Sequence, residues 1–200
     1  MSFHDILDPL TLIKTLGLLG VVLIIFAESG LFFGFFLPGD SLLFTAGILA
    51  SKGYLPISAL LVFCLIAAVL GDNVGYNFGK KTGPLIFSRE DSRFFRKSYL
   101  EKTTAFYQKH GKKTIIFARF IPIVRTFAPI LAGVAAMDYK IFFRYNLIGG
   151  VIWTWGVLGL AYILGNIIPN IERFLTPIII IILALSFIPA IIEFFKRKKI

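Results

Sequence analysis

Four charged residues stand inside apolar stretches of the sequence. Glu28 and Asp40 are 12 residues apart in one stretch, and Arg119 and Arg125 are six residues apart in another. Arginine side chains bind phosphate oxygens through paired hydrogen bonds, and a carboxylate removed from water takes up a proton more readily. The two acids and two arginines could therefore neutralise one another at rest and exchange partners when a phosphate group and a proton arrive.

Prolines interrupt both of these stretches. Pro38-Gly39 directly precedes the second acid, and Pro122 lies between the two arginines. Six residues of an unbroken helix rotate by about 240°, so the arginines would point apart without a break. The first break places the acid near the N-terminus of a half-helix, where the helix dipole also favours anionic ligands. We interpret Pro38, Gly39 and Pro122 as hairpin breaks.

The composition is that of an integral membrane protein. Of 200 residues, 57% are hydrophobic and 16% are charged, and the mean hydropathy is +0.83, far from a soluble domain. The formal net charge of +10 comes from basic residues at the ends of apolar segments. Orientation in a membrane with anionic lipids explains this pattern better than binding of nucleic acid.

The apolar segments predict one all-α polytopic membrane domain over residues 1–200, with two inverted-topology repeats. Each repeat is a re-entrant helical hairpin followed by a transmembrane helix. A cytoplasmic amphipathic helix and a further C-terminal transmembrane helix complete the fold. The predicted segments are a first hairpin at 15–50, a transmembrane helix at 54–79, the surface helix at 89–110, a second hairpin at 114–137, and transmembrane helices at 145–168 and 174–195.

The distribution of basic residues favours the re-entrant form of segment 114–137. The loop at 80–113 holds ten Lys and Arg residues, so the positive-inside rule places it in the cytoplasm. If 114–137 crossed the membrane, the later basic clusters would fall outside. A hairpin that returns to the cytoplasmic side keeps these clusters, and the C-terminus, inside.

The two halves of the chain share a weak internal similarity. An offset of 86 residues superimposes 46–79 on 132–165 without a gap, matching Gly47 with Gly133 and Tyr76 with Tyr162. One span separates the two halves, so the repeats would be inverted in the membrane, as in many secondary transporters.

Two features also have a simpler, structural interpretation. The intramembrane charges could extend separately to the membrane surfaces rather than share a site. The segment 71–79 repeats glycine every four residues, which is typical of close helix packing, although its polar residues could also line the inner exit of a site. Its secondary polar and packing residues are Asp72, Asn73, Gly75 and Tyr76.

No familiar catalytic or metal-binding pattern is present. The sequence has no Ser-His-Asp set, phosphate-binding loop or dinucleotide fingerprint, and no spacing suggests a metal site. We expect no cofactor and a transporter rather than an enzyme. Cys64 is expected to be a packing residue. Trp153 and Trp155 lie in the middle of a span, so we expect packing or lipid-facing roles for both.

The motifs together resemble the DedA family, which has the VTT (SNARE-associated) domain. The resemblance covers about residues 10–195, and this sequence keeps all four charged positions. The motifs are Glu28-Ser29 followed by Pro38-Gly39-Asp40, Gly71-Asp72-Asn73-x-Gly75-Tyr76, and Phe117-Ala-Arg119-Phe-x-Pro122-x-x-Arg125.

The resemblance implies two opposed re-entrant hairpins and a transporter of phosphate-bearing lipids, notably undecaprenyl phosphate recycled for envelope synthesis. It also implies dependence on the proton gradient. Glu28, Asp40, Arg119 and Arg125 stand where the family's required acids and arginines stand.

We therefore expect a lipid flippase of the bacterial cytoplasmic membrane. Arg119 and Arg125 would bind the lipid phosphate, and Glu28 and Asp40 would couple its movement to protons. The expected partners are an anionic phosphate-bearing lipid, protons and membrane lipids, with a homo-oligomer left open. The alternatives are a phosphatidylethanolamine flippase or scramblase, a proton-coupled exporter of small cations or drugs, and a non-transporting scaffold.

Overall fold

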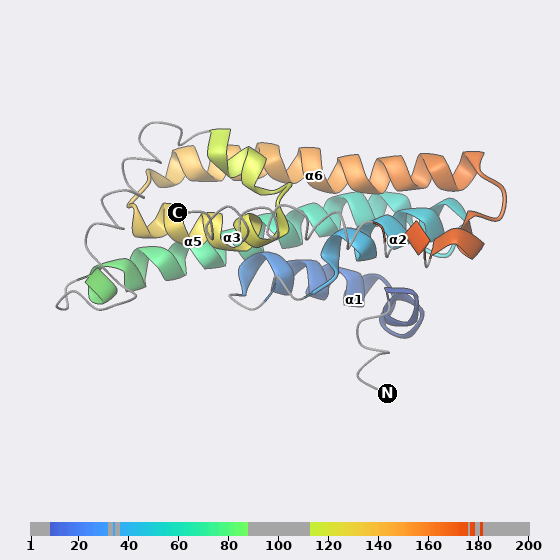
Figure 1. Ribbon diagram of the computed structural model, residues 1–200, viewed down its shortest axis with the longest axis horizontal. Coiled ribbons are helices and arrows are strands. Elements are labelled where there is room, and N and C mark those ends of the chain that lie inside the picture. Colours follow the sequence, from blue (N-terminus) through green and yellow to red (C-terminus); the bar gives the residue numbers. More distant parts are fainter. Residues whose placement is uncertain are drawn as a thin grey trace, which may run out of the picture.

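Helices and the turns that join them make up the described part of the computed structural model (Figure 1), which covers residues 9–31, 34, 37–87, 113–175, 177, 178 and 181. No strand occurs among these residues, as the sequence predicted. The helices are α1 (Pro9–Gly30), α2 (Gly39–Ser51), α3 (Ile57–Phe87), α5 (Pro122–Val134), α6 (Tyr139–Ile167) and a short 3-10 helix, η2 (Ile171–Phe174).

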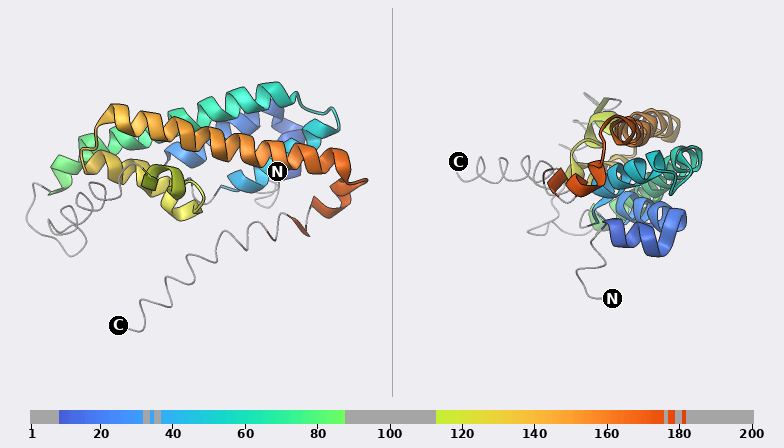
Figure 2. Two further views of the ribbon diagram at one scale, coloured as in Figure 1. Left: turned by 90° about the horizontal axis from the view of Figure 1, so that it is seen from above. Right: turned by 90° about the vertical axis from the view of Figure 1, so that its right-hand side faces the viewer.

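Two helices of the described residues are long and apolar enough to cross a membrane. They are the Ile57–Gly83 part of α3, with 27 residues, and α6, with 29 residues. At 1.5 Å per residue each is about 40 Å long, which exceeds the roughly 30 Å hydrocarbon core of a bilayer. The two helices pack side by side along the length of the molecule (Figure 2). They correspond to the predicted spans at 54–79 and 145–168.

Both long helices extend beyond their predicted bounds. α3 continues through the exposed Lys80 and Lys81 as far as Phe87, because lysine is a good helix former and its ammonium group can reach water. α6 begins at Tyr139 rather than near residue 145, because the Asp138 side chain caps it by accepting a hydrogen bond from the Ile141 amide at 3.1 Å.

The short helices α2 and α5 pack against the long helix of the opposite half. Each has 13 residues and is about 20 Å long. α2 packs on α6, and α5 packs on α3. Two glycines permit these close approaches: a Cβ on Gly47 would meet Ala161 at 2.7 Å, and one on Gly133 would meet the Lys80 amide at 2.7 Å.

The first break in the chain is wider than predicted. α1 ends at Gly30, and α2 begins at Gly39 after Pro38. Pro38 therefore lies outside the helices, as expected for a residue that restricts the backbone. Gly39 was predicted to be part of the break, but it is the first residue of α2.

The second break lies before Pro122, and Pro129 does not break the helix. Residues 113–118 are helical, a turn follows, and α5 begins at Pro122, where the missing amide hydrogen leaves no helical bond unmade. A second proline of this segment, Pro129, lies inside α5. There its Cβ lies 3.5 Å from the position that a Cβ on Gly75 would take, so Pro129 packs beside this glycine of α3. This tertiary packing outweighs the low helix propensity of proline.

The main apolar core joins α1, α2, α3 and α6. It includes Ile25, Leu42 and Leu60, each fully buried, and Cys64, which is also buried. Two predicted elements lie outside the described residues: the surface helix at 89–110 and most of the span at 174–195.

Candidate functional site

Arg125 joins three helices in a buried ion-pair cluster. Its Nη2 donates to Glu28 Oε1 of α1, and its Nη1 donates to Asp40 Oδ1 of α2 at 2.9 Å. Glu28 and Arg125 are each 2% exposed, whereas Asp40 is 24% exposed. Asp40 is therefore the carboxylate of this cluster that an incoming group reaches first.

The local backbone explains how the two acids reach one arginine. Glu28 lies near the end of α1, and Asp40 lies in the first turn of α2, where a negative charge is favourable. A Cβ on Gly39 would overlap the carboxylate of Glu28. Glycine at this position therefore leaves the space that the first acid occupies.

Trp153 of α6 also belongs to this cluster, in addition to the packing role that was predicted for it and that its place in the main apolar core confirms. Its Nε1 donates to Asp40 Oδ1 at 2.8 Å, and its ring centre lies 4.6 Å from Arg125 Cζ. The side chain is 2% exposed. Trp155, by contrast, is 47% exposed and donates to the Leu61 carbonyl at 3.1 Å, as a lipid-facing residue can.

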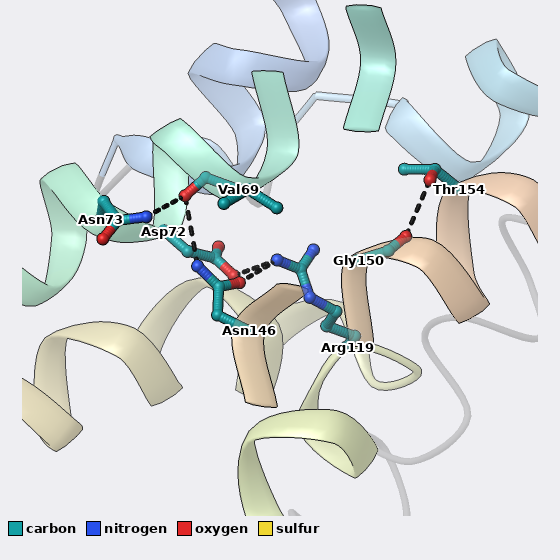
Figure 3. Close-up of polar contacts among 7 residues, drawn as sticks. All are labelled: Val69, Asp72, Asn73, Arg119, Asn146, Gly150 and Thr154. Carbon is teal, nitrogen blue, oxygen red and sulfur yellow. Dashed lines mark hydrogen bonds and ion pairs between the residues drawn. The ribbon is translucent and has the colours of Figure 1, made fainter. Parts of the chain in front are cut away.

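Arg119 forms a second cluster with Asp72 and Asn146 (Figure 3). Its Nη2 donates to Asp72 Oδ2 of α3 and to Asn146 Oδ1 of α6. Asn146 Nδ2 donates in turn to the Val69 carbonyl at 3.2 Å. Arg119 and Asp72 are each 2% exposed and Asn146 is fully buried, so the cluster lies inside the helix assembly.

Two glycines of α6 leave room for the Arg119 side chain. A Cβ on Gly149 would meet Arg119 Cδ at 3.1 Å, and one on Gly150 would meet its Nη2 at 3.7 Å. Asn146, Gly149, Gly150 and Trp153 are all buried. Their i, i+3, i+4, i+7 spacing places them on one face of the helix. This pattern could have revealed Asn146 and Trp153, the two residues of the site that were not predicted to belong to it.

The four predicted charges thus lie in two adjoining clusters rather than in one set of shared pairs. Arg125 contacts both predicted acids, whereas Arg119 contacts Asp72, for which a secondary polar or packing role was predicted. Asp72 nevertheless lies within electrostatic reach of Arg125. With three carboxylates and two guanidinium groups, the combined site carries one negative charge when all five groups are ionised.

Some buried polar atoms of the two clusters have no hydrogen-bond partner among the described residues. They are the donors Nε and Nη1 of Arg119 and Nε of Arg125, and the acceptors Oδ1 of Asp72 and Oε2 of Glu28. An unpaired buried donor is costly. The two arginines therefore keep donors with which an oxyanion could form additional hydrogen bonds.

The glycines of the 71–79 segment lie where helices approach closely. A Cβ on Gly71 would meet the Phe26 carbonyl of α1 at 2.8 Å, one on Gly75 would meet Ile130 of α5 at 3.4 Å, and one on Gly79 would collide with the Ile130 carbonyl. These contacts agree with the packing interpretation of the glycine spacing.

Two tyrosines connect this segment to the turn before α6. The Tyr76 hydroxyl donates to the Met137 carbonyl at 2.5 Å, and its ring stacks on Phe142 with centroids 4.4 Å apart. The Tyr139 hydroxyl donates to Asn73 Oδ1 at 2.9 Å. Asn73 and Tyr76 therefore hold α3 against the start of α6.

Within the described part of the chain, no group of three or more His, Cys, Asp or Glu side chains is placed to hold a metal ion.

Comparison with known proteins finds relatives that are named as membrane proteins. The family model of the VTT domain matches residues 37–163. Protein DedA of Escherichia coli is 47% identical over 179 residues, covering 88% of this chain and 81% of that protein. An uncharacterized membrane protein of Mycobacterium leprae is 46% identical over 171 residues, covering 86% and 76%.

A more distant relative is the inner membrane protein YqjA of Escherichia coli, 31% identical over 167 residues, which cover 82% of this chain and 74% of that protein. No solved structure matches the chain. On the family model and these identities, the chain belongs to the DedA family of VTT-domain membrane proteins.

Proposed function

We propose that this protein moves a phosphate-bearing lipid, undecaprenyl phosphate, across the bacterial cytoplasmic membrane. The observation that supports it best is Arg125, a buried guanidinium group held between two carboxylates from the other half of the chain, since guanidinium geometry suits a phosphate oxyanion. The relatives named as membrane or inner membrane proteins support the location. In this proposal the protein is a multi-pass transporter with a cytoplasmic C-terminus.

Two re-entrant hairpins would bring the charged clusters into the membrane. α2 and α5 have 13 residues each, about 20 Å of helix, and cannot cross a core of roughly 30 Å alone. Non-helical backbone at that depth is tolerated where protein surrounds it. The breaks at Pro38 and Pro122 would therefore be hairpin tips.

Reciprocal packing supports an inverted repeat. Gly47 and Gly133, which the offset of 86 residues aligns, each lie against the long helix of the opposite half. Gly47 approaches the Tyr162 amide, and Gly133 approaches the Tyr76 carbonyl, so the aligned tyrosines mark similar positions in both contacts. This is the relationship expected of two halves related by a pseudo-two-fold axis in the membrane plane.

The proposed transport step is an exchange of partners at Arg125. A lipid phosphate would displace Asp40, the more exposed acid, while the lipid chains stay in the bilayer. Arg119, with its unpaired Nε and Nη1, would provide a second contact. Adding an anion to a site that already carries a negative charge is unfavourable in a low dielectric, so Glu28 or Asp40 would bind a proton and link transport to the proton gradient.

The negative charge of the ionised site favours one alternative, a proton-coupled exporter of small cations. In that case the acids would bind the cation, and the arginines would hold them in place. A phosphatidylethanolamine flippase differs from both in the lipid that it moves. A scramblase would move different lipids alike and would need no gradient.

Reconstitution in liposomes tests the proposal. Movement of labelled undecaprenyl phosphate and of labelled phosphatidylethanolamine is measured with and without a pH gradient. We expect faster movement of the former in a gradient, loss in Arg125→Gln, and retention in Arg144→Gln, which alters an exposed arginine of α6. Equal, gradient-independent movement of both lipids would contradict the proposal and favour a scramblase. Cation movement without lipid movement would favour the exporter.

A further inference from the structure

Trp153 makes two different contacts with the Arg125 cluster. Its indole N–H donates to Asp40 Oδ1 at 2.8 Å, and the face of its ring lies 4.6 Å from the guanidinium carbon of Arg125. The first is a hydrogen bond to a charged acceptor, and the second is a cation–π contact. One buried side chain of α6 thus holds both members of an ion pair formed by α2 and α5.

The same carboxylate oxygen accepts two hydrogen bonds. Asp40 Oδ1 receives Arg125 Nη1 at 2.9 Å and Trp153 Nε1 at 2.8 Å. If an oxyanion takes Arg125 Nη1, Asp40 loses one donor and keeps the other. Without the indole, the displaced carboxylate would lose both donors shown here, and leaving a charged acceptor unpaired is costly.

We propose that Trp153 is a positioning residue. Its indole N–H holds the Asp40 carboxylate in place when a phosphate oxyanion replaces that carboxylate on Arg125. The ring face meanwhile keeps the guanidinium group directed toward the incoming phosphate. The proposal rests on the proposed function and adds a residue that the lipid phosphate does not itself contact.

The chain offers a matched control, because Trp155 is its only other tryptophan. Trp155 is exposed and contacts a backbone carbonyl of α3. Trp155→Phe therefore leaves Trp153 as the single tryptophan, and Trp153→Phe removes the proposed contacts. The probe is dodecyl phosphate added to the purified full chain in detergent, with dodecyltrimethylammonium as the probe of opposite charge.

We expect Trp155→Phe to bind dodecyl phosphate within twofold of the wild type, with a saturable change in Trp153 emission at the same half-saturation. Trp153→Phe should raise the half-saturation concentration about tenfold or more, the loss expected for a hydrogen bond to a charged group. If Trp153→Phe fails to fold, the emission titration of Trp155→Phe decides the question.

A measurement without ligand tests the resting contact. In the Trp155→Phe background, Asp40→Ala should shift Trp153 emission, whereas Ser41→Ala should not, because Ser41 Oγ has no hydrogen-bond partner among the described residues. Dodecyl phosphate binding that is equal in Trp153→Phe and Trp155→Phe, with no emission change, would overturn the positioning role alone. Absence of binding to the wild type would overturn the proposed function, while the ligand-free measurement would still decide the contact with Asp40.

Discussion

Arg125 and Glu28 are 97 positions apart in the sequence and form an ion pair in which each side chain is 2% exposed. The attraction between two ions removed from water outweighs the free-energy cost of their desolvation only when their geometry and hydrogen bonds are favourable. Such a pair contributes little net stability, yet losing one partner leaves a buried charge without compensation. Its placement between the two halves of the chain is what we expect of a functional site rather than of a stabilising contact.

Removing Glu28 alone should cost more than removing the pair. We expect Glu28→Ala to destabilise the protein by about 3 kcal/mol, because Arg125 stays buried with only Asp40 as a charged partner. The double variant Glu28→Ala/Arg125→Ala should recover part of that loss. Thermal unfolding in detergent measures the stability of the single variants and of the double variant. Strict additivity of the two single losses would show that the pair is not coupled.

Adding one methyl group at Gly39 should disrupt the site. A Cβ there overlaps the Glu28 carboxylate, so Gly39→Ala should displace that acid, lower stability by about 1–3 kcal/mol and abolish lipid movement. Gly159→Ala is the matched control, because nothing lies within 4 Å of its Cβ and alanine favours the helix. Unfolding and liposome assays compare the two. A Gly39→Ala variant that behaves like Gly159→Ala would refute the close contact.

Asn146 should matter to the Arg119 cluster although it is uncharged. Asn146→Ala removes an acceptor from a buried guanidinium group and should cost about 2 kcal/mol and reduce transport. Asn166→Ala, at an exposed position of the same helix, should change stability by less than about 0.5 kcal/mol. Chemical or thermal unfolding of the two variants provides the comparison, and equal losses would count against a role for the cluster.

The aligned glycines should be equally sensitive if the two halves pack alike. Gly47→Ala and Gly133→Ala each place a methyl group against backbone or side-chain atoms of the opposite long helix. We expect each to cost about 1–3 kcal/mol, with Gly156→Ala, in open space, close to neutral. The unfolding temperatures of the three variants test this expectation. Tolerance of the change at one glycine only would argue against equivalent contacts.

The sequence predicted the long helices and the charged residues, but not which charges pair. Hydropathy located α3 and α6, and Pro122 marked the start of α5 because proline favours the first turn. Local pattern could not show that Asp72 faces Arg119, and the i, i+3, i+4, i+7 spacing that groups Trp153 with Asn146 on one face of α6 does not show which helices that face contacts. Those contacts depend on how α6 is rotated against α2 and α3, which tertiary packing determines.

The hydropathy pattern also could not predict where the helices begin and end. Lys80 and Lys81 suggested the end of a span, yet α3 continues past them, since exposed lysines are compatible with a helix. Gly39 was interpreted, together with Pro38, as part of a hairpin break. Its actual role is the space that it leaves for Glu28, which no local pattern shows.

Binding of undecaprenyl phosphate to Arg125 variants tests the central claim most directly. Equilibrium binding of the labelled lipid is measured for the purified wild type, for Arg125→Lys, which keeps the charge but loses the two-pronged geometry, and for the exposed control Arg144→Lys. We predict at least a tenfold weaker affinity for Arg125→Lys and a change within twofold for Arg144→Lys. Wild-type affinity in a folded Arg125→Lys variant would contradict the claim that this buried arginine binds the lipid phosphate.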